Sequence, residues 1–294
     1  MTLAADPVGF VGVGNMGGAM ALRVLDQGGA VVAYDVSASA RERLAAAGAT
    51  IVNSPAAVAE RCAAVSLVVN YDDQVLSAVL AEDGVLAGAT PATVVAIHST
   101  IHLDTLEAVA ARAAQQSVAV LDAAVTGGVD AAARGQLAVL LGGDARAVEN
   151  IRPVLSHYAS VVVRAGDLGA GMAAKLAVMV VSFGKLAAAY EGLLLAESAG
   201  VDVVELARVI SHSEAQSGIH SFFLDARARL LHGDVESSLR EIAGHESPKA
   251  QKDLHAALEL AMRVGVELPV TRMAHDEMPD VWGLRDPASE RGRS

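Results

Sequence analysis

The chain has 294 residues, more than a single domain usually contains, and this length predicts two domains. Its formal net charge of -12 argues against nucleic acid and anionic membranes as partners, because both attract basic surfaces. Hydrophobic residues make up 53% and aromatic residues 3%, which provides ample material for an aliphatic core. Cys62 is the single cysteine, so no intrachain disulfide can form, and no leader-like apolar stretch precedes Gly9; we therefore expect a cytoplasmic protein.

The chain opens with the pattern of a nucleotide-binding unit. Residues 8–13 form a short apolar run, residues 19–25 have helical character, and residues 30–34 form a second apolar run that ends at Asp35. The turn between the first run and the helix reads Gly12-Val-Gly14-Asn-Met-Gly17. This order of strand, glycine turn, helix and strand indicates a βαβ unit whose helix N-terminus presents free N–H groups to phosphates.

Each glycine of the turn has a physical role in this interpretation. Gly12 permits the tight turn, Gly14 lets the backbone approach a pyrophosphate, and Gly17 allows the helix to pack closely on the strand. We expect the turn to contact the cofactor through Gly12, Gly14, Asn15, Met16 and Gly17.

Asp35 follows the third glycine by 18 positions, where the motif expects an acidic residue. Its carboxylate would accept hydrogen bonds from the adenosine ribose and would repel a 2′-phosphate. No arginine follows directly, since the next residues are Val36, Ser37 and Ala38. A glycine-rich structural turn, the alternative, does not account for Asp35. The pattern favours NAD over NADP.

Two further apolar runs end in polar residues. Residues 65–69 lead into Asn70-Tyr71, and residues 93–97 lead into His98-Ser99-Thr100. Ligands gather at the carboxyl ends of the strands in open α/β sheets, so Asn70, Tyr71 and Thr100 are candidates for the cofactor site. Alternatively, Ser99 or Thr100 caps a helix that begins near Asp104. His98 and His102 are four apart, but no carboxylate or cysteine completes a ligand set, and we predict no metal site.

Glycine pairs follow two more apolar runs. Residues 118–125 enter Thr126-Gly127-Gly128, and residues 136–141 enter Gly142-Gly143-Asp144. Such pairs expose backbone N–H groups that can bind a carboxylate. A tight turn between strands is the competing interpretation, because glycine serves it equally well.

The chain resembles the β-hydroxyacid dehydrogenase family, which includes 3-hydroxyisobutyrate dehydrogenases and tartronate semialdehyde reductases. The likeness rests on five blocks in a fixed order: residues 9–17, His98-Ser-Thr-Ile101, Leu121-Asp-Ala-Ala-Val-Thr-Gly-Gly128, Gly169-Ala-Gly-Met-Ala-Ala-Lys175, and Lys252-Asp253-Leu254.

The resemblance implies an α/β fold in which a Rossmann-type doubly wound sheet is followed by an all-helical domain. We expect a dinucleotide-binding domain over residues 1–166 and a helical substrate and dimerisation domain over residues 167–294, with a homodimer or homotetramer as the assembly. By the family's pattern Lys175 matches the catalytic lysine, and Lys252 matches a second lysine near the active site. Thr126, Gly127 and Gly128 match the substrate loop, and Thr100 the nicotinamide neighbourhood.

The chain departs from the family at two places. Ala124 and Thr126 stand where the family usually has proline and serine, so the hydroxyl of the loop is retained with an extra methyl group. Val178 and Met179 stand where two asparagines usually follow the lysine. Residues three and four apart share a helix face, so both should flank Lys175 and contact the substrate. An apolar wall in place of two amides favours a less hydroxylated substrate than tartronate semialdehyde.

We therefore expect an oxidoreductase that transfers a hydride between NAD and a small β-hydroxy acid or its semialdehyde. Lys175 would act as general acid/base, and the substrate would carry a carboxylate. An imine reductase-like enzyme and a non-catalytic nucleotide-binding protein are the alternatives. Lys175 can also be a solvated lysine of an amphipathic helix, and Lys252 a plain surface residue.

The second half of the chain has helical patterns. Residues 172–199 have an apolar pattern, and its most apolar part, residues 172–196, is interrupted by Lys175, Lys185 and Glu191. This predicts a helix buried on most sides rather than a membrane span. Further helices are predicted at residues 201–210, 222–231 and 249–264, with glycines near their ends, and a disordered tail over residues 283–294.

Overall fold

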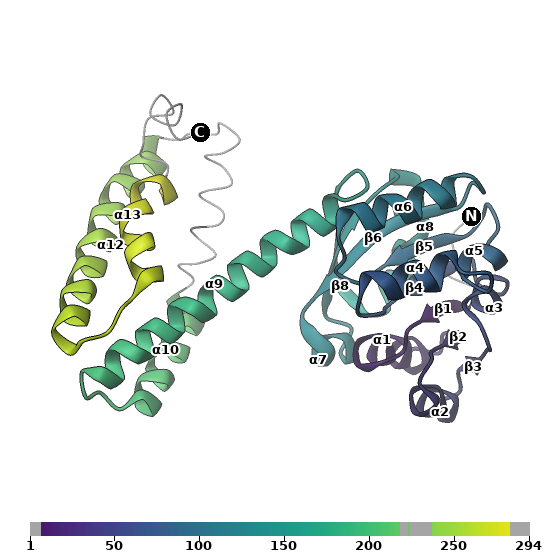
Figure 1. Ribbon diagram of the computed structural model, residues 1–294, viewed down its shortest axis with the longest axis horizontal. Helices are drawn as coiled ribbons and strands as arrows, with labels where there is room; N and C mark the ends of the chain where they lie inside the picture. Colours follow the sequence, from purple (N-terminus) through teal and green to yellow (C-terminus); the bar gives the residue numbers. More distant parts are fainter. Residues whose placement is uncertain (1–6, 218–222, 224–236, 283–294) are drawn as a thin grey trace. The chain divides into compact units, whose positions relative to one another are not determined.

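The computed structural model describes residues 7–217, 223 and 237–282, and it forms two compact units, Met1–Met179 and Val180–Ser294 (Figure 1). The strands are β1 (Val8–Val11), β2 (Val31–Tyr34), β3 (Thr50–Ile51), β4 (Ala64–Leu67), β5 (Val94–Ile97), β6 (Ala119–Thr126), β7 (Leu137–Gly142) and β8 (Ala159–Gly166). The helices of the first unit are α1 (Asn15–Asp26), α2 (Ala38–Ala46), α3 (Pro55–Ala59), α4 (Asp72–Leu80), α5 (Val85–Gly88), α6 (Leu103–Ala114), α7 (Gly128–Ala133) and α8 (Ala145–Leu155). Helix α9 (Ala170–Ser198) begins in the first unit and continues into the second.

The first unit is built on one sheet of eight strands in the order β3-β2-β1-β4-β5-β6-β7-β8. Strands β1 to β6 are parallel in the order expected of a dinucleotide-binding sheet, and β7 pairs antiparallel with β6. The order reverses at β1 and β4, so a crevice opens at the carboxyl ends of these strands. This confirms the predicted Rossmann-type doubly wound sheet.

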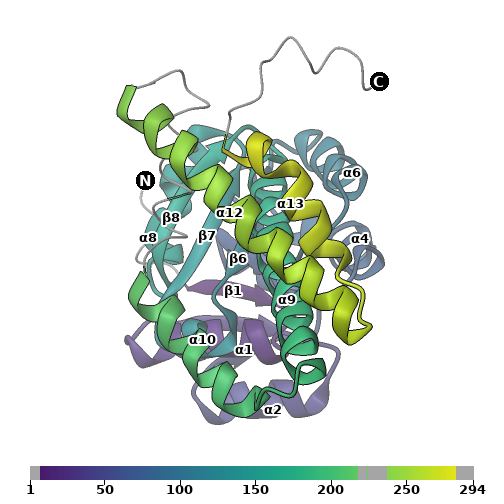
Figure 2. The ribbon, with the colours of Figure 1, turned by 90° about the vertical axis from the view of Figure 1, so that its left-hand side faces the viewer.

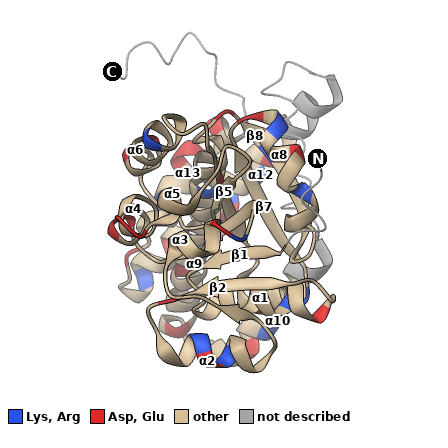
Figure 3. Cartoon of the chain, turned by 90° about the vertical axis from the view of Figure 1, so that its right-hand side faces the viewer, with Lys and Arg blue, Asp and Glu red and all other residues tan. Residues whose placement is uncertain are grey.

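Successive side chains of the strands enter two separate hydrophobic clusters. Phe10 and Ala96 belong to the cluster under α1, α2, α7 and α8, whereas Val11 and Ile97 belong to the cluster under α3 to α6. The alternation follows from the period of two in a β-strand, and it places helices on both faces. Figure 3 shows charged residues mainly on the helices and connections, and strands β1, β2, β4 and β5 contain none.

Two strands were not apparent from the sequence. Strand β3 has two residues, too few for a periodic signal, and β8 is an edge strand most of whose side chains are exposed on both faces. Strand β3 therefore carries no periodic signal, and the apolar run Val161-Val162-Val163 of β8 is only three residues long.

Helix α9 is less buried than its composition predicts. It is long and apolar enough to cross a membrane by length and composition, yet only 6% of its most apolar 18-residue window is buried within the chain. The prediction of a helix buried on most sides is therefore wrong for the single chain. The side chains of α9 are mostly small or aliphatic on all sides of the helix. Other elements of the same chain cover only some of these side chains.

Every described element of the second unit is a helix, which confirms the predicted all-helical part. After α9 come α10 (Val203–Ser217), α12 (Ser237–Val264) and α13 (Pro269–Val281), and α12 and α13 lie side by side (Figure 2). A small core joins Leu258, Ala261 and Leu268. The predicted helix over residues 222–231 and the predicted tail over residues 283–294 lie outside the described residues, apart from position 223.

Candidate functional site

The glycine turn has the geometry that its sequence predicts. Gly12 has a φ of +87°, and a β-carbon there would collide with the carbonyl oxygen of Val68. A β-carbon on Gly17 would collide with the carbonyl oxygen of Gly12. Both positions therefore require glycine, one for the turn and one for the packing of α1 against it.

Gly14 has a different environment, and it points to a ligand. It is the N-cap of α1, no side chain caps the helix there, and the first turn holds no acidic residue. A β-carbon on Gly14 would meet no atom within 4 Å. The chain thus leaves the first N–H groups of α1 without an internal acceptor and leaves open space beside them. That arrangement suits an anionic group such as a pyrophosphate.

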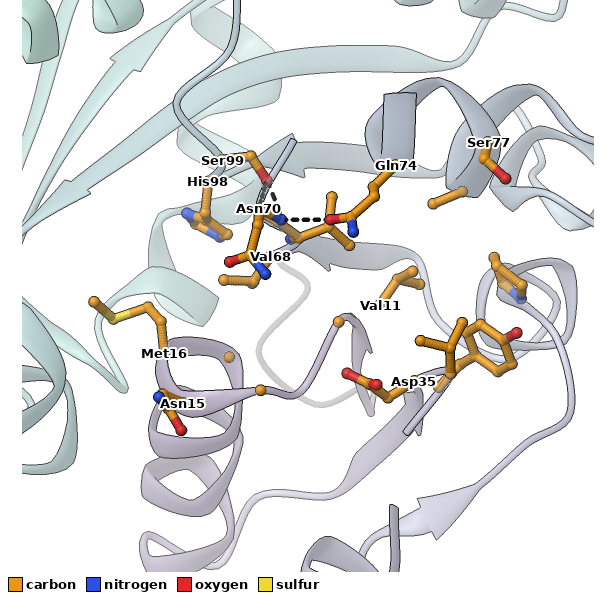
Figure 4. Close-up of a pocket in the computed structure, with 18 of the residues that line it drawn as sticks. Val11, Asn15, Met16, Asp35, Val68, Asn70, Gln74, Ser77, His98 and Ser99 are labelled. Atoms are coloured by element: carbon orange, nitrogen blue, oxygen red, sulfur yellow. Dashed lines mark hydrogen bonds between the residues drawn. The ribbon is translucent and has the colours of Figure 1, made fainter. Parts of the chain in front are cut away.

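Asp35 lies directly after β2 and braces the glycine turn. One carboxylate oxygen, Oδ2, accepts a hydrogen bond from the backbone N–H of Val13 at 2.6 Å, and Oδ1 accepts one from Ser37 at 2.7 Å. The guanidinium of Arg43 donates a hydrogen bond to the carbonyl oxygen of Val13, at 3.1 Å. Figure 4 shows the Asp35 carboxylate facing the cavity, where its remaining lone pairs can accept hydrogen bonds from ribose hydroxyls.

The ends of β4 and β5 are held together by side chains. The hydroxyl of Ser99 donates to the carbonyl oxygen of Val69 at 2.7 Å and accepts from its N–H at 3.1 Å. Gln74 Oε1 accepts a hydrogen bond from the backbone N–H of Asn70 at 2.9 Å. The side chain of Asn70 lies at the cavity (Figure 4). The N-cap of α6 is His102, so neither Ser99 nor Thr100 caps that helix.

His98 lies buried at the carboxyl end of β5. Its Nδ1 is 2.6 Å from the carbonyl oxygen of Ala123, and its Nε2 is 3.2 Å from the hydroxyls of Ser66 and Tyr158. Nδ1 therefore donates its hydrogen to Ala123, and Nε2 is the acceptor. Burial lowers the pKa of His98 to about 4, although the carbonyl of Ala123 opposes the shift, and burial raises the pKa of Tyr158.

These elements enclose a cavity of about 880 Å³. Eight of the nine predicted cofactor residues line it: Gly12, Gly14, Asn15, Met16, Gly17, Asp35, Asn70 and Thr100. Tyr71 is not in the lining; it is the N-cap of α4 and is largely exposed. Sequence reasoning missed Gln74 and Ser77, which also line the cavity. Their helical spacing, three apart on the helix that follows Asn70, was the available signal.

The predicted substrate loop borders the cavity. Thr126 ends β6, and Gly127 and Gly128, with φ of +128° and +81°, turn the chain into α7. These three residues are not in the cavity lining, but their neighbours Val125 and Val129 are. The second glycine pair serves the fold itself, because the N–H of Gly143 donates to the carbonyl of Gly166.

Lys175 lies near the start of α9, outside the cavity lining. Three residues earlier Met172 is fully buried in the same cluster as Ile97 and Ile101, near the carboxyl end of β5. The spacing of three puts Lys175 on the same side of α9. Lys175 is half-buried, and burial lowers its pKa. Val178 and Met179 are half-buried and follow it on that side.

Lys252 lies in α12 of the second unit. Its side chain is exposed, and its ammonium group is 3.1 Å from Asp253 Oδ1. The predicted site residues thus fall into three groups: the cavity and its bordering loop, the start of α9, and Lys252. Among the described residues no cluster of three or more metal-ligating side chains occurs.

Comparisons with known proteins point in one direction. Residues 7–166 match the family model described as the NAD binding domain of 6-phosphogluconate dehydrogenase. Residues 169–281 match the model described as NAD-binding of NADP-dependent 3-hydroxyisobutyrate dehydrogenase.

Individual relatives extend over nearly the whole chain. An uncharacterised oxidoreductase of Mycobacterium tuberculosis is 37% identical over 96% of this chain and 95% of its own length. The 3-hydroxyisobutyrate dehydrogenase of Pseudomonas aeruginosa is 29% identical over 92% of this chain and 90% of its own. The crystal structure of an oxidoreductase from Mycobacterium avium 104 superposes with a TM-score of 0.85 at 36% identity, covering 96% of this chain and 100% of that one.

Proposed function

The chain belongs to the β-hydroxyacid dehydrogenase family, and from this membership we propose that it oxidises a small β-hydroxy acid with NAD, or reduces the corresponding semialdehyde. The observation that carries the proposal is the pairing of a dinucleotide-sized cavity with a half-buried lysine at the start of α9. We further propose that residues 1–166 form the cofactor domain and residues 167–294 the substrate and dimerisation domain. The extents of the two family matches support this division.

NAD is the cofactor we propose for the cavity. The uncapped N-terminus of α1 would bind its pyrophosphate, and Asp35 would accept the ribose hydroxyls. A 2′-phosphate would face the Asp35 carboxylate and no directly following arginine, which disfavours NADP. Asn70 and Thr100, at the ends of β4 and β5, would border the nicotinamide, with Tyr71 at the outer edge of this loop.

Lys175 is the proposed general acid/base. Bound NAD would supply the hydride acceptor for the hydroxyl-bearing carbon of the substrate. The amino group of Lys175 accepts the hydroxyl proton in the same event, which it can do only while neutral. Burial lowers the pKa of Lys175 and so increases the neutral fraction. The N–H groups around Thr126, Gly127 and Gly128 would hold the substrate carboxylate, with Lys252 as a second lysine of the site.

The substrate class follows from the residues beside the lysine. Val178 and Met179 follow Lys175 at the spacings that share its helix face, and they offer no hydrogen bonds to a substrate. We propose a β-hydroxy acid whose remaining substituents are apolar. The same two residues favour a second candidate, an imine reductase-like activity, because they replace the amides that the family uses beside the lysine.

We propose that the enzyme works as a cytoplasmic homodimer or homotetramer. The exposed apolar side chains of Val180, Phe183, Leu186 and Tyr190 lie along one face of α9. Glu191 is buried on the same helix, and its carboxylate accepts hydrogen bonds from Val270 and Thr271. A helix that uses a buried carboxylate in this way suits a protein interface better than a lipid bilayer.

The test is a substrate panel with the purified protein. We expect NAD reduction with β-hydroxy acids that carry alkyl substituents, weaker reduction with polyhydroxylated acids, and no turnover of cyclic imines. Imine reduction without hydroxy acid oxidation would establish the second candidate. Binding of NAD with no turnover of either class would identify a non-catalytic protein and sink the proposal.

The variant Lys175→Ala tests the role of the lysine. Its turnover should fall by about 10²- to 10⁴-fold while NAD binding stays unchanged, as expected for loss of a general acid/base. In the wild type, the rate of oxidation should fall as the pH drops through the pKa of Lys175, because protonation removes the base. The control is Lys185→Ala on the exposed side of the same helix. Full turnover by Lys175→Ala would refute the assignment.

A further inference from the structure

Asp122 is a buried carboxylate in the middle of β6, and the proposed chemistry does not use it. Its Oδ1 accepts a hydrogen bond from the N–H of Gly169 at 2.8 Å, and its Oδ2 accepts one from the N–H of Met172 at 2.7 Å. Both donors lie at the N-terminus of α9, three residues apart. The carboxylate therefore ties the first turn of the lysine-bearing helix to the sheet, and its negative charge faces the positive end of the helix dipole.

The space around Asp122 is made by glycines. A β-carbon on Gly142 would collide with Asp122 Oδ1. One on Gly171 would lie 2.9 Å from Oδ2 and 2.8 Å from the backbone nitrogen of Gly142, and it would collide with the carbonyl oxygen of Leu140. The helix can approach the carboxylate this closely because neither glycine has a side chain. Gly142 and Gly171 thus leave the space in which the Asp122 carboxylate meets the first turn of α9.

Strand β6 connects this anchor to the substrate loop. Asp122, Ala124 and Thr126 lie on the same side of the strand, because side chains alternate between faces. Thr126 follows Asp122 by four positions along the strand, a span of about 13 Å. At the other end, Lys175 follows Met172 by three residues, a rise of about 4.5 Å along the helix. A single rigid strand thus carries both the helix anchor and the substrate loop.

We propose that Asp122 is a positioning residue that sets where the amino group of Lys175 lies relative to the carboxylate-binding loop. Without the anchor, the start of α9 shifts away from β6 and carries Lys175 with it. A displacement of about 1 Å at a reacting group can lower a rate on the order of 10²-fold. The inference rests on the proposed role of Lys175.

The matched pair of variants is Asp122→Asn and Asp144→Asn. Asp144 also caps a helix of the first unit, since its Oδ1 accepts from the N–H of Ala147 at 2.9 Å, but it caps α8. Asp122→Asn should lower kcat by about 10- to 100-fold with KM for NAD within about twofold, and should shift the pH profile. Asp144→Asn should change none of these beyond about twofold. Equal effects of the two substitutions would reduce Asp122 to an ordinary helix cap.

A second measurement does not depend on turnover. Competitive acetylation with acetic anhydride, read by mass spectrometry, gives the reactivity of Lys175 relative to Lys185 across pH. The ratio should change in Asp122→Asn and stay constant in Asp144→Asn; an unchanged ratio in both overturns the positioning role. If the wild type oxidises no hydroxy acid, the proposed function fails and this ratio still decides the anchor. If Asp122→Asn does not fold, Gly171→Ala, which crowds the same contact, should give the same changes.

Discussion

The imidazole of His98 is buried, and its hydrogen-bond partners are protein groups on β4, β6 and the segment after α8. These partners form hydrogen bonds with the neutral ring. Burial disfavours the charged form, so the pKa of His98 falls to about 4 from an ordinary 6.5. Three residues on separate elements, Ser66, Ala123 and Tyr158, therefore constrain the strand end that leads into Ser99 and Thr100.

The low pKa of His98 predicts a pH dependence of stability. Above about pH 6.5 the ring is neutral in both states, and the fold keeps its full stability. As the pH falls from 6.5 toward 4, the unfolded chain gains a proton that the folded chain excludes. The free energy of unfolding should therefore drop by about 3 kcal/mol across this window.

Urea unfolding at several pH values measures this dependence. The variant His98→Gln should lose the His98 part of the slope between pH 6.5 and 4. The exposed Gln116, changed to alanine as a control, removes no titratable group and should leave the slope as in the wild type. A slope that His98→Gln does not alter would contradict the linkage.

At the scale of single elements, α13 begins without a cap of its own. Its N-cap, Leu268, has no side-chain hydrogen bond to offer. Glu191 of α9 supplies the acceptor instead, with Oε1 at 2.7 Å from the N–H of Val270 and Oε2 at 2.8 Å from the N–H of Thr271. The Thr271 hydroxyl also donates to Oε2 at 2.7 Å. One buried carboxylate thus joins two helices of the second unit.

Removing that carboxylate should destabilise the second unit. Glu191→Ala leaves two half-buried N–H groups and a hydroxyl without their charged acceptor, at a cost on the order of 2 kcal/mol. Thermal unfolding followed by circular dichroism gives the change, and Glu197→Ala, an exposed glutamate on the same helix, should be nearly neutral. Similar losses for both variants would mean that the capping contact contributes nothing specific.

At the scale of the molecule, α9 has a long exposed apolar face. Val180 and Tyr190, at 74% and 68% exposed, mark its two ends. Exposed apolar stripes of this extent identify interaction sites in soluble proteins, and a second copy of the chain is the partner we propose.

The mass in solution tests this interface. Light scattering after size exclusion should give at least twice the chain mass of 30.0 kDa for the wild type. Phe183→Glu should shift the population toward the single-chain mass, because it places a charge in the centre of the stripe. Val161→Glu, at an exposed position of the edge strand β8, is the control and should not change the mass. A measured mass of one chain for the wild-type protein would contradict the proposed dimer.

The sequence alone was sufficient for those parts of the protein whose signal is local. Gly12 is required by the positive φ of its own turn and Gly17 by a contact with Gly12, five residues earlier, so their spacing predicted the cofactor unit. Six strands were predictable because strands in the interior of a sheet covered on both faces are largely apolar runs. Asp35 was predictable because its position depends only on the length of one βαβ unit.

Tertiary structure decided what depends on contacts between distant parts of the chain. No pattern around Asp122 reveals that its carboxylate reaches Gly169 and Met172, 47 and 50 residues further on. The partners of His98 and the cap that Glu191 provides for α13 are likewise set by how strands and helices pack. The burial of α9 could not be read from its composition, because apolar residues alone do not say whether the covering surface belongs to the same chain.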